Sequence, residues 1–244
     1  MPHDRLAIIA LTLALVALLL LVVSGLGYRN ALWALPAAFT MVKWAAYLGI
    51  AGGLVALVGM FIARPVGRTT FLFAVAFLLA VVAAGIPWSL KRRAGQVPPI
   101  HDISTDTQDP PAFVAVLPLR ANAKNSAAYG GDSVAALQHA GYPDITPIHL
   151  ALPSDAAFQR ARDAAAAMGW AMVATDSAAG RIEATATTRW FGFKDDIVIR
   201  VRGEGVRSRV DVRSVSRIGG SDVGTNAARI RAYAARLGGS SAGA

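Results

Sequence analysis

Three long apolar segments in the first ninety residues constrain this chain more than any other feature. They are residues 6–27, 44–63 and 71–88, and none of them contains a charged residue. A helix needs roughly 20 apolar residues to cross the ~30 Å hydrocarbon core of a bilayer. The sequence therefore predicts three transmembrane helices within residues 1–90, with the lipid bilayer as their partner.

The distribution of charge argues against a nucleic-acid partner. The net charge is +9, but residues 1–93 hold eight basic groups and a single acidic one, Asp4, whereas the rest of the chain holds sixteen basic and fourteen acidic groups. The excess therefore flanks the apolar segments, where basic residues meet anionic headgroups and help to set orientation. We expect no nucleic-acid binding, and the sequence names no protein partner.

The orientation of the polar half follows from the same charges. With three spans, Arg5, Arg64 and Arg68 lie on one side, while Arg29, Lys43 and the cluster 91–93 lie on the other. Cytoplasmic loops carry the excess of Lys and Arg, so three against five favours a cytoplasmic soluble domain. No charged residue lies inside a span, which disfavours an ion or proton pathway.

The chain after the third span has the size and patterning of one soluble domain. A basic and then Pro-containing stretch, residues 91–99, is typical of a linker, and Pro98-Pro99 favours an extended backbone. We predict a soluble domain over residues 100–239 and a disordered tail over 240–244. The chain lacks Cys, so neither disulfides nor cysteine-based zinc sites are available to it.

Periodicity in the soluble half predicts an α+β fold. Apolar Ile182 and Ala184 alternate with Glu183 and Thr185, the pattern of a sheet with one solvated face. We expect an antiparallel meander and two flanking helices in a two-layer sandwich. The predicted strands are 113–117 at an edge, 170–175, 181–188, 195–202 and 206–216; the predicted helices are a short one at 132–139, one with Ser154 as N-cap and Gly169 as stop, and a final one from Ser221-Asp222.

The hairpin between the last two predicted strands brings like charges together. If its apolar residues share one face, Arg200 and Arg202 lie near Arg207 and Arg209 on the other. Like charges facing each other destabilise a sheet unless they are neutralised. An ion-pair network or an anionic ligand could do so, and the carboxylates available to the network are Asp195, Asp196, Asp211 and Glu183.

Residues 101–109 form the most polar cluster of the chain. Asp102, Ser104 and Asp106 alternate as the first ligands of a calcium loop would, but the turn Gly is missing and Phe113 stands where the bidentate Glu belongs. The segment is therefore not an EF-hand. Asp, Ser and Thr also hydrogen-bond their own backbone in turns, so a structured loop is the expected role. We predict neither a metal site nor a cofactor.

Several short motifs together resemble a known family. They are residues 101–106 with 110–113, then 142–145, 195–197, and 213–217 continuing through Ser221-Asp222 to Asn226. In this order they resemble the bacterial domain of unknown function 1499, over roughly residues 101–237. That family is often found behind N-terminal hydrophobic segments, although the membrane half of this chain lies outside the resemblance. The bacterial family and the three apolar segments together predict a multi-pass protein of the bacterial inner membrane. It implies no activity or catalytic residue, but it singles out polar positions as site candidates: Asp102, Thr105, Asp106, Asp196, Arg213, Ser216, Asp222 and Asn226.

Two functions are compatible with this sequence. The first is an integral membrane protein whose soluble domain is a non-catalytic binding or envelope-associated module. The alternative is a metal-dependent or carboxylate-based hydrolase that uses His101, Asp102 and Asp106 of the loop from His101 to Asp109. The two differ in one structural property: an enzyme needs these side chains to converge in an open pocket.

Overall fold

The computed structural model describes residues 2–64 and 66–239, and it divides the chain into two compact units. The first comprises the three N-terminal helices together with the short loop Arg189–Gly192, and the second begins at Ala94 and holds the remaining residues. The tail that we expect to be disordered, residues 240–244, lies outside the described residues.

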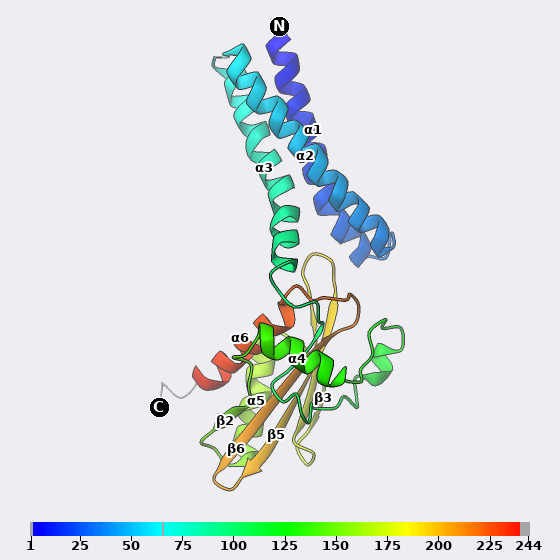
Figure 1. The fold of residues 1–244 in the computed structure, drawn as a ribbon, viewed down its shortest axis with the longest axis vertical. Coiled ribbons are helices and arrows are strands. Elements are labelled where there is room, and N and C mark those ends of the chain that lie inside the picture. The colour runs from blue at the N-terminus through cyan, green and yellow to red at the C-terminus, as the bar shows by residue number, and fades with distance from the viewer. Residues whose placement is uncertain (1, 65, 240–244) are drawn as a thin grey trace. The chain divides into compact units, whose positions relative to one another are not determined.

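The first unit contains the three predicted spans. They are α1 (Pro2–Arg29), α2 (Leu35–Ala63) and α3 (Arg68–Ala94), each long and apolar enough to cross a membrane (Figure 1). Glycines allow close approach of the helices: a Cβ on Gly52 would lie 3.2 Å from the Ala10 carbonyl oxygen, and one on Gly49 would lie 3.1 Å from that of Ala80. Such small residues let helix backbones pack without a polar contact.

The second unit has the predicted α+β architecture. The strands form one antiparallel sheet in the order β1-β6-β5-β4-β3, and β2 pairs with a separate part of β6. The longest strands, β5 and β6, run side by side (Figure 1). The elements are β1 (Asp102–Ser104), the 3₁₀ helix η1 (Leu117–Arg120), α4 (Gly131–Gly141), β2 (Ile148–Leu150), α5 (Ser154–Ala167), β3 (Ala171–Asp176), β4 (Arg181–Thr187), β5 (Lys194–Glu204), β6 (Arg207–Ser216) and α6 (Thr225–Gly239).

One face of the sheet packs against α5 and α6. Ile182, Ile199 and Val212 are fully buried there with Tyr233 of α6, whose ring stacks on Trp170 at 5.4 Å between centroids. The hairpin register follows the rule derived from its apolar residues, because Ile199 pairs with Val212 and the paired residue numbers sum to an odd value. This face is the core that the alternating pattern predicts.

The middle of the other face is covered, which corrects the prediction of a wet face, although Lys194 and Arg202 near its ends remain exposed. Glu183, Asp196 and Asp211, all on this face, have no exposed surface. The irregular segment 105–129 covers them, and Phe113 and Val116 of that segment pack on Val198 and Val215. Alternation could not reveal this, because a polar residue can be buried when a covering segment supplies its partners.

The strand predicted at residues 113–117 is wrong, and the cover explains why. The N–H groups of Val114, Ala115 and Val116 donate to the carboxylate of Glu183 at 3.0, 3.0 and 2.8 Å, and not to a neighbouring strand. The 3₁₀ helix η1 begins at Leu117, and its Pro118 lacks the N–H that a continuing strand would need. Three backbone donors therefore converge on one side chain.

Three smaller differences concern the starts of two helices and the presence of two short strands. The N-cap position of α5 is Pro153, so Ser154 is already helical and makes no cap. The final helix begins at Thr225, later than predicted, because Ser221-Asp222 form a turn ahead of it. Strands β1 and β2 were not predicted, since three residues are too few to show a period. The predicted short helix, in contrast, is α4.

Candidate functional site

Asp102 and Arg213 form a buried ion pair beneath the covering segment. Strand β1 places Asp102 opposite Val215 of β6, two residues from Arg213. The guanidinium donates to both carboxylate oxygens, Nε to Oδ1 at 2.9 Å and Nη2 to Oδ2 at 2.7 Å. Such bidentate pairs are among the strongest in proteins. Both partners are therefore charge-compensated.

Aromatic rings and carbonyl groups complete the surroundings of Arg213. Its guanidinium lies 5.3 Å from the Phe113 ring centre and 5.4 Å from that of Tyr129, and it donates to the carbonyl oxygens of Pro111 and Ala127. Burial is the main cause that raises the pKa of Tyr129 to about 12, and the Asp102 carboxylate adds to it. Arg213 thus ties the covering segment to the sheet.

Thr105 and Asp106 follow β1 directly. The Thr105 hydroxyl accepts a hydrogen bond from the Val212 N–H at 2.8 Å, while its own N–H donates to the Val212 carbonyl at 2.9 Å, so the β1–β6 ladder extends by one residue. The Asp106 carboxylate accepts backbone N–H bonds from Gln108 and Asp109, the geometry of an Asx turn. Both side chains thereby bond to backbone.

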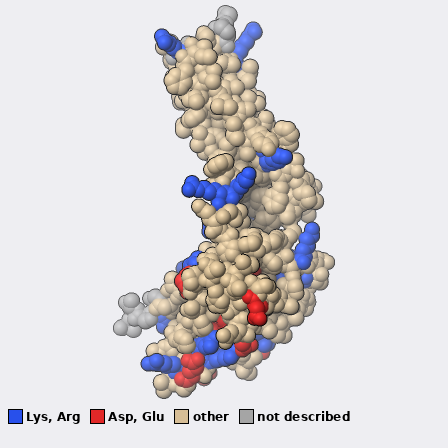
Figure 2. All heavy atoms as spheres, in the orientation of Figure 1, with Lys and Arg blue, Asp and Glu red and all other residues tan. Residues whose placement is uncertain are grey.

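Asp106 also neutralises the arginines of the hairpin. Arg209 and Arg200 donate to its Oδ2 at 2.6 and 3.2 Å, and Arg200 also pairs with Asp211 at 2.9 Å. Figure 2 shows basic and acidic atoms adjoining one another towards the bottom of the view, where the β5–β6 turn lies in Figure 1. Of the four carboxylates expected to serve this network, only Asp211 does so. Asp106 and Asp109 replace the other three.

Asp196 is the centre of a second arginine cluster. Arg120 of η1 and Arg217 donate to its two oxygens at 2.6 and 2.7 Å, and the Thr185 hydroxyl donates at 2.7 Å. Burial opposes ionisation, but the hydrogen bonds from Arg217, Thr185 and Arg120 outweigh it and hold the pKa of this carboxyl below its usual value. Asp196 therefore stays ionised under the cover.

Ser216, Asp222 and Asn226 connect β6 to α6. The Asn226 amide donates to the Ser216 hydroxyl and to the His101 carbonyl, both at 3.0 Å. Asp222 accepts N–H bonds from Gly224 and Asn226 at the start of α6. Burial raises the pKa of Asp222 despite these bonds. This third group ties α6 to the end of the sheet.

The eight family positions therefore do not converge on one point. They form separate contacts at the β1–β6 pair, the hairpin, the η1 cover and the α6 turn. Within residues 2–64 and 66–239, no three His, Asp or Glu side chains are grouped so that they could hold a metal ion. The carboxylates of Asp102 and Asp106 are each bonded to arginine. Oxygens of both carboxylates already accept guanidinium N–H bonds, so the two groups serve as structural acceptors.

One open pocket does adjoin the family motif. It has a volume of about 420 Å³ and lies between the chain that leads into β1, the loop after η1 and α4. Its apolar wall includes Ile100, Val134 and Leu137, and Leu137 is 43% exposed. The remaining lining residues are Pro99, His101, Asp102, Lys124, Asn125, Ser126, Ala128, Gly130 and Gly220.

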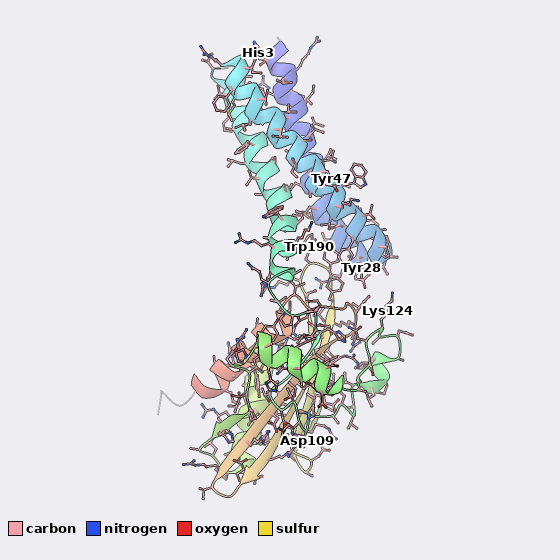
Figure 3. The ribbon with its side chains drawn as sticks, in the orientation of Figure 1. His3, Tyr28, Tyr47, Asp109, Lys124 and Trp190 are labelled. Carbon is pink, nitrogen blue, oxygen red and sulfur yellow. The ribbon has the colours of Figure 1, made fainter. Side chains whose placement is uncertain are left out.

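The polar groups of this pocket differ in how far they are already engaged. The Asn125 amide donates to the carbonyls of Ser216 and Gly219, and Asp102 is paired with Arg213. Lys124 is exposed and projects outward from the loop that follows η1 (Figure 3). Among the described residues, Lys124 and the His101 ring make no side-chain hydrogen bond or ion pair. The uncommitted groups of the pocket are thus donors or cations.

Sequence reasoning missed several residues on which this region depends. Glu183 looked like an exposed strand residue, and Arg120 and Gln138 lie in segments without a clear period. Gln138 bridges α4 to β1, because its amide accepts from the Ser104 N–H at 2.9 Å and donates to the Ser104 carbonyl at 2.6 Å. No local signal marks Glu183 as buried, because apolar neighbours flank any polar residue of an alternating strand.

Comparison with known proteins agrees with this architecture. The family model described as protein of unknown function (DUF1499) matches residues 102–237, which is more than half of the chain and spans β1 to α6. No curated protein matches the sequence.

Proposed function

This chain belongs to the DUF1499 family, and from that premise we propose that it is a membrane-anchored, non-catalytic binding protein. The three N-terminal helices would hold it in the bacterial inner membrane, with residues 100–239 as a soluble domain on the cytoplasmic side. The pocket beside β1 would take the ligand. Binding sites are typically concave and largely apolar with a few polar groups, and this pocket has that character.

The proposal rests on one observation: the carboxylates of the family motif are bonded to arginines. Asp102, Asp106 and Asp196 are each bonded to one or more arginines, and Asp102 and Asp196 are almost without exposed surface. A hydrolase needs a carboxylate or imidazole that can reach substrate and exchange a proton near neutral pH. Here the carboxylates hold a covering segment in place. The pocket does contain one imidazole, His101, but the one carboxylate in its lining, Asp102, is bonded to Arg213.

Photo-crosslinking of the full-length protein in intact cells tests this proposal. We would replace Ala128, which lines the pocket and is exposed, with the photoreactive residue p-benzoylphenylalanine. A matched variant carries the same residue at Ala178, which is exposed in the turn between β3 and β4. After irradiation and purification, mass spectrometry reports what is attached to each position.

We expect a discrete adduct at position 128 that is absent at position 178. An unmodified position 128, or the same adducts at both positions, would contradict a binding role for the pocket. A discrete adduct whose mass is that of a cleaved product, accumulating with time, would instead favour the hydrolase.

A further inference from the structure

We infer that the pocket beside β1 binds the phosphate-bearing headgroup of an anionic phospholipid from the membrane in which the chain is anchored. This inference rests on the proposed function and names the ligand class of the same pocket. Three independent properties support it: the charge of the uncommitted groups, the apolar wall and the length of the linker.

The polar side chains of the pocket that can still donate a hydrogen bond favour an anionic ligand. Lys124 brings a full positive charge to the rim, and the His101 ring and the Ser126 hydroxyl can each donate a hydrogen bond. Ser126 already accepts the Ala128 N–H at 3.0 Å, so its hydroxyl proton remains to be donated. The one acidic residue of the lining, Asp102, is compensated by Arg213. A cation would meet no free carboxylate in this pocket.

The apolar wall selects an amphiphile over a small inorganic anion. Ile100, Val134 and Leu137 line one side, and Leu137 remains 43% exposed. A phosphate ion would leave this surface in water, whereas the glycerol backbone and the first methylenes of a lipid would cover it, and burying apolar area is favourable. The pocket therefore offers both a site for a charged group and a site for a hydrocarbon group.

The linker makes a bilayer ligand available at high local concentration. Only residues 95–98 separate the end of α3, at Ala94, from Pro99 of the pocket lining. Even fully extended, such a stretch spans no more than about 17 Å. The last turn of α3 contains Lys91, Arg92 and Arg93, which attract anionic lipids to the same leaflet. A lipid of the membrane that anchors the protein is present at high local concentration, so the pocket needs little intrinsic affinity for it.

The test uses the full-length Ala128 photoreactive variant in nanodiscs of defined lipid. One set contains phosphatidylcholine alone, and the other contains phosphatidylcholine with 30% phosphatidylglycerol. We expect a phosphatidylglycerol adduct at position 128 that is at least about tenfold more abundant per lipid molecule than the phosphatidylcholine adduct. Lys124→Gln should reduce it about fivefold. Lys194→Gln, which removes the same charge from an exposed site outside the pocket, should leave it unchanged.

Each alternative result has a defined meaning. Equal labelling by both lipids, or equal loss in both lysine variants, would overturn a specific anionic site. Loss of the phosphatidylglycerol adduct in 10 mM inorganic phosphate would show that free phosphate takes the pocket in preference to the lipid, which overturns the lipid inference but leaves the proposed binding function in place. Discrete adducts in cells that are not lipids would do the same. If neither cells nor nanodiscs yield an adduct, the proposed function itself fails.

Discussion

One face of the sheet packs against the apolar stripes of α5 and α6, whereas the other packs against the irregular segment 105–129 through ion pairs and hydrogen bonds to carboxylates. The first kind of burial tolerates many sequences, because apolar contact is not directional. The second requires each donor to meet its acceptor, since an unpaired buried charge is costly. The two faces should therefore respond differently to substitution.

Tryptophan fluorescence can follow this difference in the full-length protein. Trp170 lies in the apolar core of the second unit, stacked on Tyr233. With the other tryptophans replaced by Phe, emission during urea unfolding in detergent micelles reports the second unit alone. The positions to replace are Trp33, Trp44, Trp88 and Trp190.

The largest effect should come from Glu183→Ala on the polar face. It leaves three backbone N–H groups and the Arg181 guanidinium without their buried acceptor, so we expect a loss of about 3–5 kcal/mol in the free energy of unfolding. Two conservative changes compare the faces directly. Ile182→Val on the apolar face removes one methyl group, and about 0.5–1.5 kcal/mol is expected. Glu183→Gln keeps the size of its side chain but should cost more; equal costs for these two changes would mean that the faces do not differ in kind.

Removing one partner of the Asp102–Arg213 pair should cost more than removing both. We expect Asp102→Ala to lose about 3 kcal/mol, because Arg213 is left buried without its counter-ion. The double variant Asp102→Leu, Arg213→Met should recover most of this loss, and a thermodynamic cycle of single and double variants gives the coupling directly. Purely additive losses would show that the pair is not coupled.

Substitution of Asp106 separates charge from shape. Asp106→Asn keeps an acceptor for the Gln108 and Asp109 N–H groups, so it should cost less than Asp106→Ala, for which about 1–3 kcal/mol is expected. Added calcium, magnesium or zinc should leave the melting temperature unchanged. A rise in melting temperature with one of these metals that Asp106→Asn abolishes would instead identify a metal site.

The smallest effect concerns the pH dependence of stability, and its sign differs between the buried Asp196 and the half-buried Asp222. Because the pKa of Asp196 is lowered on folding, its contribution is present above the unfolded value of ~3.9 and is lost as the pH falls through the folded pKa. The pKa of Asp222 is raised, so its ionised form costs stability at neutral pH and protonation relieves that cost as the pH falls through the folded pKa.

Two variants measured between pH 7 and pH 3 isolate these contributions. The deficit of Asp196→Asn relative to the unmodified protein should shrink below about pH 4, whereas the deficit of Asp222→Asn should grow as the pH falls from neutral toward 4. If both deficits change in the same direction, at least one of the two carboxyls does not ionise as the structure requires.

The same contrast explains which parts of the fold could be predicted. Ile199 and Val212 carry a period, and periodicity with turn and capping residues predicted the meander, the odd sum of its paired residue numbers and the helices that cover it. Nothing local distinguishes Glu183 from a solvated strand residue, because its partners lie 67 to 69 residues away. The same limit applies to the candidate site residues. The family motifs indicated Asp102 and Arg213, but they did not indicate that these two side chains bond to each other.

The pairing of β1 with β6 determines when this domain can be completed. Asp102 and Arg213 are 111 residues apart, so the first strand to leave the ribosome waits for the last. Folds closed by such distant contacts form slowly. During synthesis β1 emerges with its hydrogen-bonding groups unpaired until β6 follows. Completion of the second unit is therefore a late event, because its first strand cannot pair until its last strand has been made.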